Sequence, residues 1–308
     1  MMNRTKQSKN YIASLSDFIF NEYNLSAISI TPAKRGFFGE TWQLDTSDCK
    51  YFLKLVYVAA HQSIYERSFA VIEHLCRHGI DFISKAIKTT DSRLFTRFDG
   101  AVLGMFEWIE GENRETNATK SYEYEMLAKV YTVPTYGVQI SVEDFSGISA
   151  DTFFEQWKVT NDTQVLSLLE KNRTKLEYRA ERLKHFSDLC KNDTTNFFIT
   201  HGDAGGNFIV SNGKHFIVDW DNSVLAPPER DAWEMGFQDW AQRLFQEKLR
   251  QNGINYNLRP ERLAYYAYHV FFYCLTWFTR CSTAEEIEGF FNAYGSERIE
   301  YADNYLRH

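Results

Sequence analysis

The sequence predicts an α+β fold with two lobes, in which a small antiparallel β lobe that carries one helix is followed by a larger helical lobe. Three observations lead to this prediction. Short segments of alternating apolar and polar residues recur between Ala27 and Glu107. Helical spacing of apolar residues dominates from Tyr122 onward, and one strongly β-like stretch, Phe197 to Val218, lies within that helical half. A chain of 308 residues is long enough for two such lobes.

The predicted β lobe spans residues 1–108 and holds five strands and one inserted helix. An amphipathic first helix precedes three strands between Ala27 and Tyr57. Helical spacing over Ser63 to His78 ends at Gly79, a residue type that often follows a helix. The last two strands are separated by a hairpin turn at Asp99-Gly100 and cover Arg93 to Phe98 and Val102 to Glu107. The helical lobe spans residues 109–308, with helical spacing over Asp151 to Trp157, Thr163 to Asn192 and Leu263 to Phe278.

Composition and charge narrow the class of protein. A net charge of −7 disfavours nucleic acid as a partner. The five cysteines are scattered and form neither a disulfide framework nor a zinc motif, as expected in a reducing, cytoplasmic environment. The first helix contains Asp17 and lacks a cleavage signal, and the apolar run from Leu263 to Phe278 is too short to span a bilayer comfortably. We therefore expect no membrane partner.

The most informative pattern is His201-Gly-Asp203 with Asn207 four residues later, then two short strands and Asp219-Trp-Asp221. This order is that of a kinase catalytic loop and its downstream metal-binding aspartate, and it predicts phosphoryl transfer from a nucleoside triphosphate. Asp203 would accept the proton of an incoming hydroxyl. Asn207 and Asp219 offer oxygen ligands that suit magnesium (Mg²⁺). Asp221 could be a second metal ligand or could only brace the loop.

Upstream segments supply candidates for the nucleotide site. Lys54 lies between two leucines on the third predicted strand and could contact the α- and β-phosphates. Its expected partner is a glutamate on the following helix, with Glu66 favoured over Glu73. The turn containing Gly36 and Phe38 could cover the phosphates, although it lacks the full glycine-rich pattern and a plain hairpin turn is nearly as good a reading. In the crossing segment, the Glu107 carbonyl and the Ile109 N–H could bind an adenine edge.

Together these motifs resemble the aminoglycoside phosphotransferase family, which shares a protein-kinase-like fold with choline and homoserine kinases. The block Leu225-Ala-Pro-Pro-Glu-Arg-Asp231 looks most like the spectinomycin phosphotransferase branch. The resemblance implies that Asp203 is the catalytic base, that Asn207 and Asp219 bind magnesium, and that Lys54 contacts the phosphates. It also implies that Asp231 is a buried residue that braces the catalytic loop.

The acceptor is the least determined part of the prediction. We expect ATP or GTP as the phosphate donor and a cationic small molecule, such as an aminocyclitol antibiotic, as the acceptor. A choline-, ethanolamine- or homoserine-type kinase is the alternative enzyme, and a catalytically silent nucleotide-binding module is the alternative from another class. Acidic and aromatic side chains of the helical lobe could select an amine: Trp233, Glu234, Asp239, Trp240, Tyr265, Tyr266, Tyr268, Glu285, Glu286, Glu288 and Asp303.

Overall fold

The computed structural model describes residues 9–33, 39–114 and 116–304. The chain divides into two compact units, each made of two segments. The first unit comprises Met1–Ser141 and His201–Val224, and the second comprises Val142–Thr200 and Leu225–His308. The predicted lobe boundary, between residues 108 and 109, lies inside the first unit.

A five-stranded antiparallel sheet forms the core of the first unit, with strand order β1-β2-β3-β5-β4. The predicted fold class, a small antiparallel sheet in a mixed α+β chain, is confirmed. The elements of this part are α1 (Lys9–Tyr23), β1 (Ser29–Pro32), β2 (Glu40–Asp45), β3 (Lys50–Val56), α2 (Ala59–Arg77), β4 (Thr96–Phe98) and β5 (Ala101–Glu107). The hairpin turn between β4 and β5 has positive φ angles of 47° at Asp99 and 77° at Gly100.

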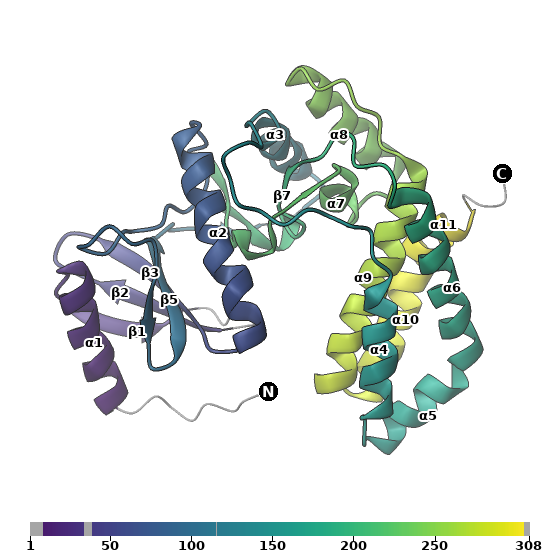
Figure 1. Cartoon of the computed structure of the whole chain (residues 1–308), viewed down its shortest axis with the longest axis horizontal. Helices are drawn as coiled ribbons and strands as arrows, with labels where there is room; N and C mark the ends of the chain where they lie inside the picture. Colours follow the sequence, from purple (N-terminus) through teal and green to yellow (C-terminus); the bar gives the residue numbers. More distant parts are fainter. Residues whose placement is uncertain (1–8, 34–38, 115, 305–308) are drawn as a thin grey trace. The chain divides into compact units, whose positions relative to one another are not determined.

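The alternation of side chains along β3 divides its residues between the two faces of the sheet. Leu53 and Leu55 belong to the apolar core that includes Leu15 and Ile19 of α1. Because successive residues of a strand point to opposite faces, Lys54 points to the other face, where α2 lies (Figure 1). The Lys54 side chain is therefore shielded by α2 and is largely buried.

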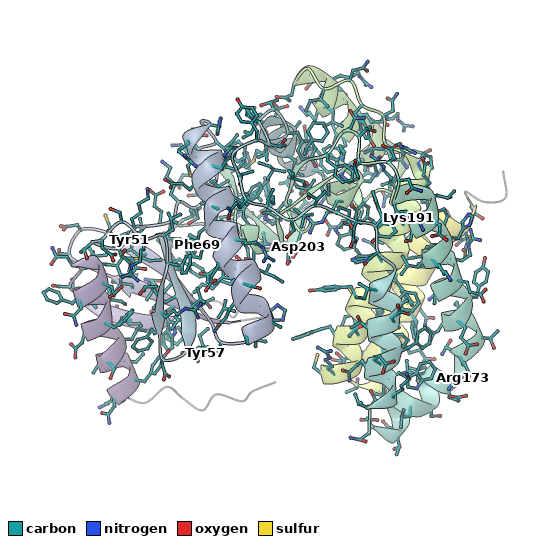
Figure 2. The ribbon with its side chains drawn as sticks, viewed as in Figure 1. Tyr51, Tyr57, Phe69, Arg173, Lys191 and Asp203 are labelled. Carbon is teal, nitrogen blue, oxygen red and sulfur yellow. The ribbon has the colours of Figure 1, made fainter. Side chains whose placement is uncertain are left out.

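The helix α2 approaches the sheet closely at Gly104. A Cβ atom at this position would overlap the Phe69 ring and the Tyr65 hydroxyl. Phe69, labelled in Figure 2, also stacks on Phe106 of β5 with ring centroids 5.4 Å apart. The absence of a side chain at Gly104 is therefore what allows the aromatic face of α2 to pack against the sheet.

The β-like stretch of the second half of the sequence joins the first unit. It contains β8 (Phe208–Ser211) and β9 (Lys214–Ile217), and β8 also pairs with β6 (Glu112–Asn113). The predicted turn between β8 and β9 is confirmed, with φ angles of 48° at Asn212 and 77° at Gly213. This small sheet pairs β6, which precedes residues 142–200 of the second unit, with β8, which follows them. Residues 201–224 therefore belong to the first unit.

The second unit is helical and is organised around α9 (Pro260–Cys281), which contacts α4 (Ile148–Lys158) and α6 (Arg173–Cys190) (Figure 1). The long predicted helix over Thr163 to Asn192 is two helices that divide at Asn172. None of the described helices is both long and apolar enough to cross a membrane. Further elements of the described chain, in both units, are α3 (Lys120–Val130), α5 (Thr163–Lys171), β7 (Phe198–Thr200), η1 (Gly205–Asn207), β10 (Val224–Ala226), α7 (Glu229–Ala232), α8 (Asp239–Gln251), α10 (Ala284–Tyr294), η3 (Gly295–Ile299) and α11 (Glu300–Asn304).

Glu229 is a buried acid in the second unit. Its carboxylate accepts hydrogen bonds from the Tyr256 hydroxyl at 2.9 Å and the Arg259 N–H at 2.5 Å. Burial raises the pKa of Glu229 to about 7, although these hydrogen bonds and the Arg262 charge act in the opposite direction. The side chain is therefore protonated more readily in the folded protein than in the unfolded chain.

Replacing Glu229 with glutamine should make stability less dependent on pH. Because the folded pKa exceeds the ordinary value of 4.5, the wild-type residue stabilises the fold below that value and loses this contribution as pH rises to about 7. Urea unfolding of both proteins at pH 5 and pH 8 should show the wild type losing roughly 1–3 kcal/mol relative to Glu229→Gln. An equal difference at both pH values would contradict this.

Gly104→Ala should destabilise the protein, because the added methyl group forces α2 away from the sheet. We expect a loss of roughly 1–3 kcal/mol in the free energy of unfolding. Gly289→Ala is the matched control, since a Cβ at Gly289 meets no atom within 4 Å and alanine favours a helix. Thermal melting of both variants tests the prediction, which fails if Gly104→Ala melts with the wild type.

Candidate active site

Lys54 lies at the centre of the candidate site in the first unit. Its ammonium nitrogen Nζ is 2.7 Å from Asp219 Oδ1 and 2.7 Å from Asp221 Oδ2. The lysine side chain is only 10% exposed. The structure thus brings together the predicted phosphate-binding lysine and both acids of the Asp-Trp-Asp motif, which lie more than 160 residues away in sequence.

Trp220 explains why both flanking acids face Lys54. Its indole ring is buried, and its Nε1–H donates a hydrogen bond of 3.0 Å to the Ile217 carbonyl. Asp219 has a left-handed backbone with φ of 63°, which aspartate tolerates better than most residues, and the chain then enters the short helix η2 (Trp220–Asn222). The turn therefore buries the tryptophan and leaves the two carboxylates on the opposite side.

His201 connects the catalytic loop to this turn. The Asp203 N–H donates to His201 Nδ1 at 3.2 Å, so Nδ1 is an acceptor and the ring proton lies on Nε2. Nε2 then donates to the Val218 carbonyl at 2.9 Å. The ring also meets Trp220 edge to face, with centroids 4.7 Å apart. A fully buried neutral histidine thus fixes the position of the loop that carries Asp203.

Asp203, labelled in Figure 2, is exposed, and Asn207 of the same loop is half-buried. The Asn207 amide nitrogen donates to the Asp203 backbone carbonyl at 2.8 Å. Because this bond uses the NH₂ end of the amide, Asn207 Oδ1 points away from that carbonyl and remains as an acceptor or metal ligand. The Asn207 amide and the Asp219 carboxylate offer hard oxygen atoms of the type that suits magnesium, which usually takes one or two protein ligands together with phosphate oxygens and water, and their role as its ligands remains a prediction.

Lys54, Asp219 and Asp221 shift one another's pKa values. Burial by itself lowers the pKa of Lys54, but Asp221 and Asp219 outweigh it and raise that pKa. Burial raises the pKa of Asp221 to about 6 against the pull of Lys54, and the nearby Asp219 charge adds to the rise. For Asp219, burial is outweighed by Lys54, and the pKa is lowered. Asp219 is thus the more strongly ionised of the two acids.

The predicted partner of Lys54 is wrong. Glu66 pairs with Arg97, and the second choice, Glu73, pairs with Lys88 at 2.8 Å. The residue of α2 that contacts Lys54 is Tyr65, whose hydroxyl donates to the Lys54 carbonyl at 3.3 Å. The sequence spacing of a helix does not show which of two adjacent residues faces a given strand, because packing sets the rotation of the helix about its axis.

The other nucleotide-site candidates are placed less completely. Gly36 and Phe38 lie outside the described residues. The Glu107 carbonyl accepts a hydrogen bond from the Ser84 hydroxyl at 2.7 Å and has a second lone pair, while Ile109 follows in the segment between β5 and β6. Phe52, which the sequence reading missed, lies two residues before Lys54 on the same face of β3. Its ring centroid is 6.5 Å from that of Trp108.

Several proposed acceptor contacts in the second unit have structural roles. Tyr265, Tyr266 and Tyr268 are buried in the helical core. Glu286 forms a capping box with Thr283 at the start of α10. Asp303 accepts a hydrogen bond from the Tyr268 hydroxyl. These tyrosines follow the ordinary rule that aromatic residues at helical spacing form a core.

Two further acids of the second unit are buried or half-buried. Glu143, which the sequence reading missed, accepts hydrogen bonds from the Tyr266 hydroxyl at 3.0 Å and the Phe145 N–H at 2.9 Å. Glu143 belongs to no recognisable sequence motif, so its role is evident only from its contacts in the structure. Asp231 is buried in α7, and its role in bracing the catalytic loop remains a prediction.

The fold and the sequence together define a protein-kinase-like phosphotransferase with an alcohol group as acceptor. A family model described as the phosphotransferase enzyme family (APH) matches residues 29–268. The chain belongs to this family and is a small-molecule kinase. The search of curated protein sequences gave no match.

Solved structures of small-molecule kinases share the fold. Spectinomycin phosphotransferase APH(9)-Ia, in complex with ADP and spectinomycin, has a TM-score of 0.74 at 19% identity, covering 94% of this chain and 97% of that one. A microcompartment-associated aminopropanol kinase has a TM-score of 0.66 at 13% identity, covering 96% and 98%. Choline kinase LicA from Streptococcus pneumoniae has a TM-score of 0.63 at 15% identity, covering 95% and 97%.

His201→Ala should destabilise the protein and lower its activity. The change removes a buried ring and leaves the Val218 carbonyl without its imidazole donor, at a cost of roughly 2–4 kcal/mol. His185→Ala is the control, because His185 is an exposed residue of α6. Thermal denaturation and turnover should both separate the two variants, and matching melting temperatures would remove His201 as the anchor of the loop.

Proposed function

We propose that this kinase transfers the γ-phosphate of ATP or GTP to a hydroxyl of an amine-bearing acceptor, and that an aminocyclitol antibiotic such as spectinomycin is the leading candidate. The observation that carries the nucleotide site is the ammonium of Lys54, held 2.7 Å from both Asp219 and Asp221. A buried cation fixed in this way is prepared to meet phosphate charge without further reorganisation. If the enzyme is cytoplasmic, it would phosphorylate the antibiotic inside the cell and so make that cell resistant.

The catalytic step requires a base near the acceptor hydroxyl, and Asp203 is our choice. The acceptor oxygen attacks the γ-phosphorus, its proton passes to the Asp203 carboxylate, and the nucleoside diphosphate leaves. Asn207 and Asp219 would hold magnesium. When bound, Mg²⁺ neutralises charge on the β- and γ-phosphates. The exposed position of Asp203 supports this role, because the base must be open to an incoming substrate.

The base of the nucleotide would lie near the crossing segment. There the Glu107 carbonyl and Ile109 N–H could meet its polar edge, and Phe52 supports this placement by adding an aromatic surface beside Trp108. Main-chain contacts of this kind fit either ATP or GTP. Gly36 and Phe38 remain our candidates for covering the phosphates.

The preference for an amine-bearing acceptor rests on the relatives in structure. Two structures of spectinomycin phosphotransferase each have a TM-score of 0.74. The choline and aminopropanol kinases favour a metabolic amino alcohol as the second candidate, and an ethanolamine- or homoserine-type activity belongs with it. The silent-module alternative is weaker, because the sequence retains Lys54, Asp203, Asn207 and Asp219 together.

A panel assay tests the acceptor class. Release of ADP or GDP would be followed with Mg²⁺ and each acceptor in turn: spectinomycin, several aminoglycosides, choline, ethanolamine, aminopropanol and homoserine. We expect turnover with spectinomycin or a related antibiotic. Turnover confined to choline or another amino alcohol would move the enzyme to metabolism and overturn the leading candidate.

Asp203→Asn should fold and bind nucleotide but lose turnover by about 10²–10⁴-fold, since the amide cannot accept the hydroxyl proton. The matched control is Asp188→Asn, which changes an exposed acid of α6 in the same way. Turnover with the preferred acceptor and the affinity for nucleotide would be measured for both variants. Near-normal turnover of Asp203→Asn would remove this residue as the base.

A further inference from the structure

The environment of Lys54 departs from the expected pairing with a helix glutamate. The α2 residue beside Lys54 is the aromatic Tyr65. Its ring centroid lies 5.5 Å from Lys54 Nζ, and its hydroxyl donates a hydrogen bond to the Lys54 carbonyl. Tyr65 is fully buried. The helix therefore offers the lysine a cation–π contact and a backbone anchor, but the charge that pairs with its ammonium group comes from elsewhere.

The rotation of α2 keeps its glutamates away from Lys54. Neighbouring residues of a helix differ by about 100° in direction, so Tyr65 and Glu66 cannot face the same group. Tyr65 and Phe69 are seated against the sheet at Gly104, where no side chain intervenes. Glu66 is consequently directed to Arg97 of β4, which also bonds to Gln62 at 3.2 Å. Turning Glu66 toward Lys54 would require breaking this packing.

The two acids that do meet Lys54 differ in exposure. The Asp219 side chain is 44% exposed, whereas the Asp221 side chain is 22% exposed. The helix α2 packs against η2, the short helix that carries Asp221. Asp219 is thus the acid that is open to a metal and a nucleotide, and Asp221 is the acid enclosed beside Lys54.

We propose that Asp221 is the positioning residue of Lys54 and performs the task that the sequence assigns to a glutamate of α2. The inference rests on the proposed nucleotide site. With Asp219 engaged by a metal ion, Asp221 would still hold the ammonium group in place and balance its charge. Without Asp221, a largely buried ammonium would lose its fixed partner and its fixed direction. Asp221 then acts through Lys54 and not as a second metal ligand.

A double-mutant cycle tests this assignment. The affinity for ATP in the presence of Mg²⁺ and kcat/KM would be measured for the wild type, Asp221→Asn, Lys54→Met and the double variant. If Asp221 acts through Lys54, each single change should weaken nucleotide binding at least about tenfold, and the double variant should bind within about twofold of Lys54→Met. Independent effects that multiply in the double variant would overturn the proposal.

Two controls separate positioning from the rival roles. The Mg²⁺ concentration that gives half-maximal activity should be the same for Asp221→Asn and the wild type, and restoration of activity by excess Mg²⁺ or by Mn²⁺ would instead make Asp221 a metal ligand. Glu66→Gln should bind nucleotide and turn over within about twofold of the wild type, because Glu66 pairs with Arg97. A tenfold loss in Glu66→Gln would return the role to α2 and overturn the proposal.

A conservative variant covers a failure to fold. Circular dichroism would first establish that each variant is folded. If Asp221→Asn is not, Asp221→Glu retains the charge but displaces it by one methylene, and it should lower kcat while leaving the Mg²⁺ requirement unchanged. A raised Mg²⁺ requirement in that variant would contradict the proposal. If the wild type binds neither ATP nor GTP, the proposed function fails and the inference fails with it, whereas the outcomes above concern Asp221 alone.

Discussion

The pairing of Lys54 with Asp219 and Asp221 is the interaction on which the candidate site depends. It joins the central strand of the sheet to a turn that follows much later in the chain. A single ammonium group beside two carboxylates leaves one negative charge in excess, and a magnesium ion would compensate such a charge. The same contact therefore fixes the lysine and prepares the turn to receive a metal with its nucleotide.

Two buried aromatic rings hold this arrangement in place. Trp220 turns the Asp-Trp-Asp segment so that both of its acids face Lys54, and His201 attaches the catalytic loop to the same segment. Both rings have their polar atoms hydrogen-bonded to backbone groups, which avoids the penalty of burying unpaired donors and acceptors. The consequence is that the exposed Asp203 and the acids beside Lys54 rest on a buried, hydrogen-bonded support.

Polar and charged side chains are placed differently in the sheet and in the helical unit. In the sheet, alternation along β3 places Leu53 and Leu55 in one core and Lys54 on the other face. In the second unit, α9 is buried along most of its length, and its tyrosines fill a core instead of lining a surface. Acidic groups such as Glu229 and Glu143 are held there by tyrosine hydroxyls and backbone N–H groups, so a carboxylate in a helical lobe is not by itself a sign of a ligand site.

The sequence by itself predicted the five strands of the main sheet, the hairpin of β8 and β9, the helices α1, α2, α4 and α9, and the motifs, because periodicity and turn chemistry are local properties. The turns at Asp99-Gly100 and Asn212-Gly213 were predictable from residues that tolerate positive φ angles. The division of the long helix at Asn172, the seating of Tyr65 where a glutamate was expected, and the enclosure of Asp221 beside Lys54 were decided only by the tertiary structure. The positions of Tyr65 and Asp221 depend on packing between distant segments, namely the close approach of α2 to the sheet at Gly104 and the contact of α2 with η2. Local sequence does not specify such contacts.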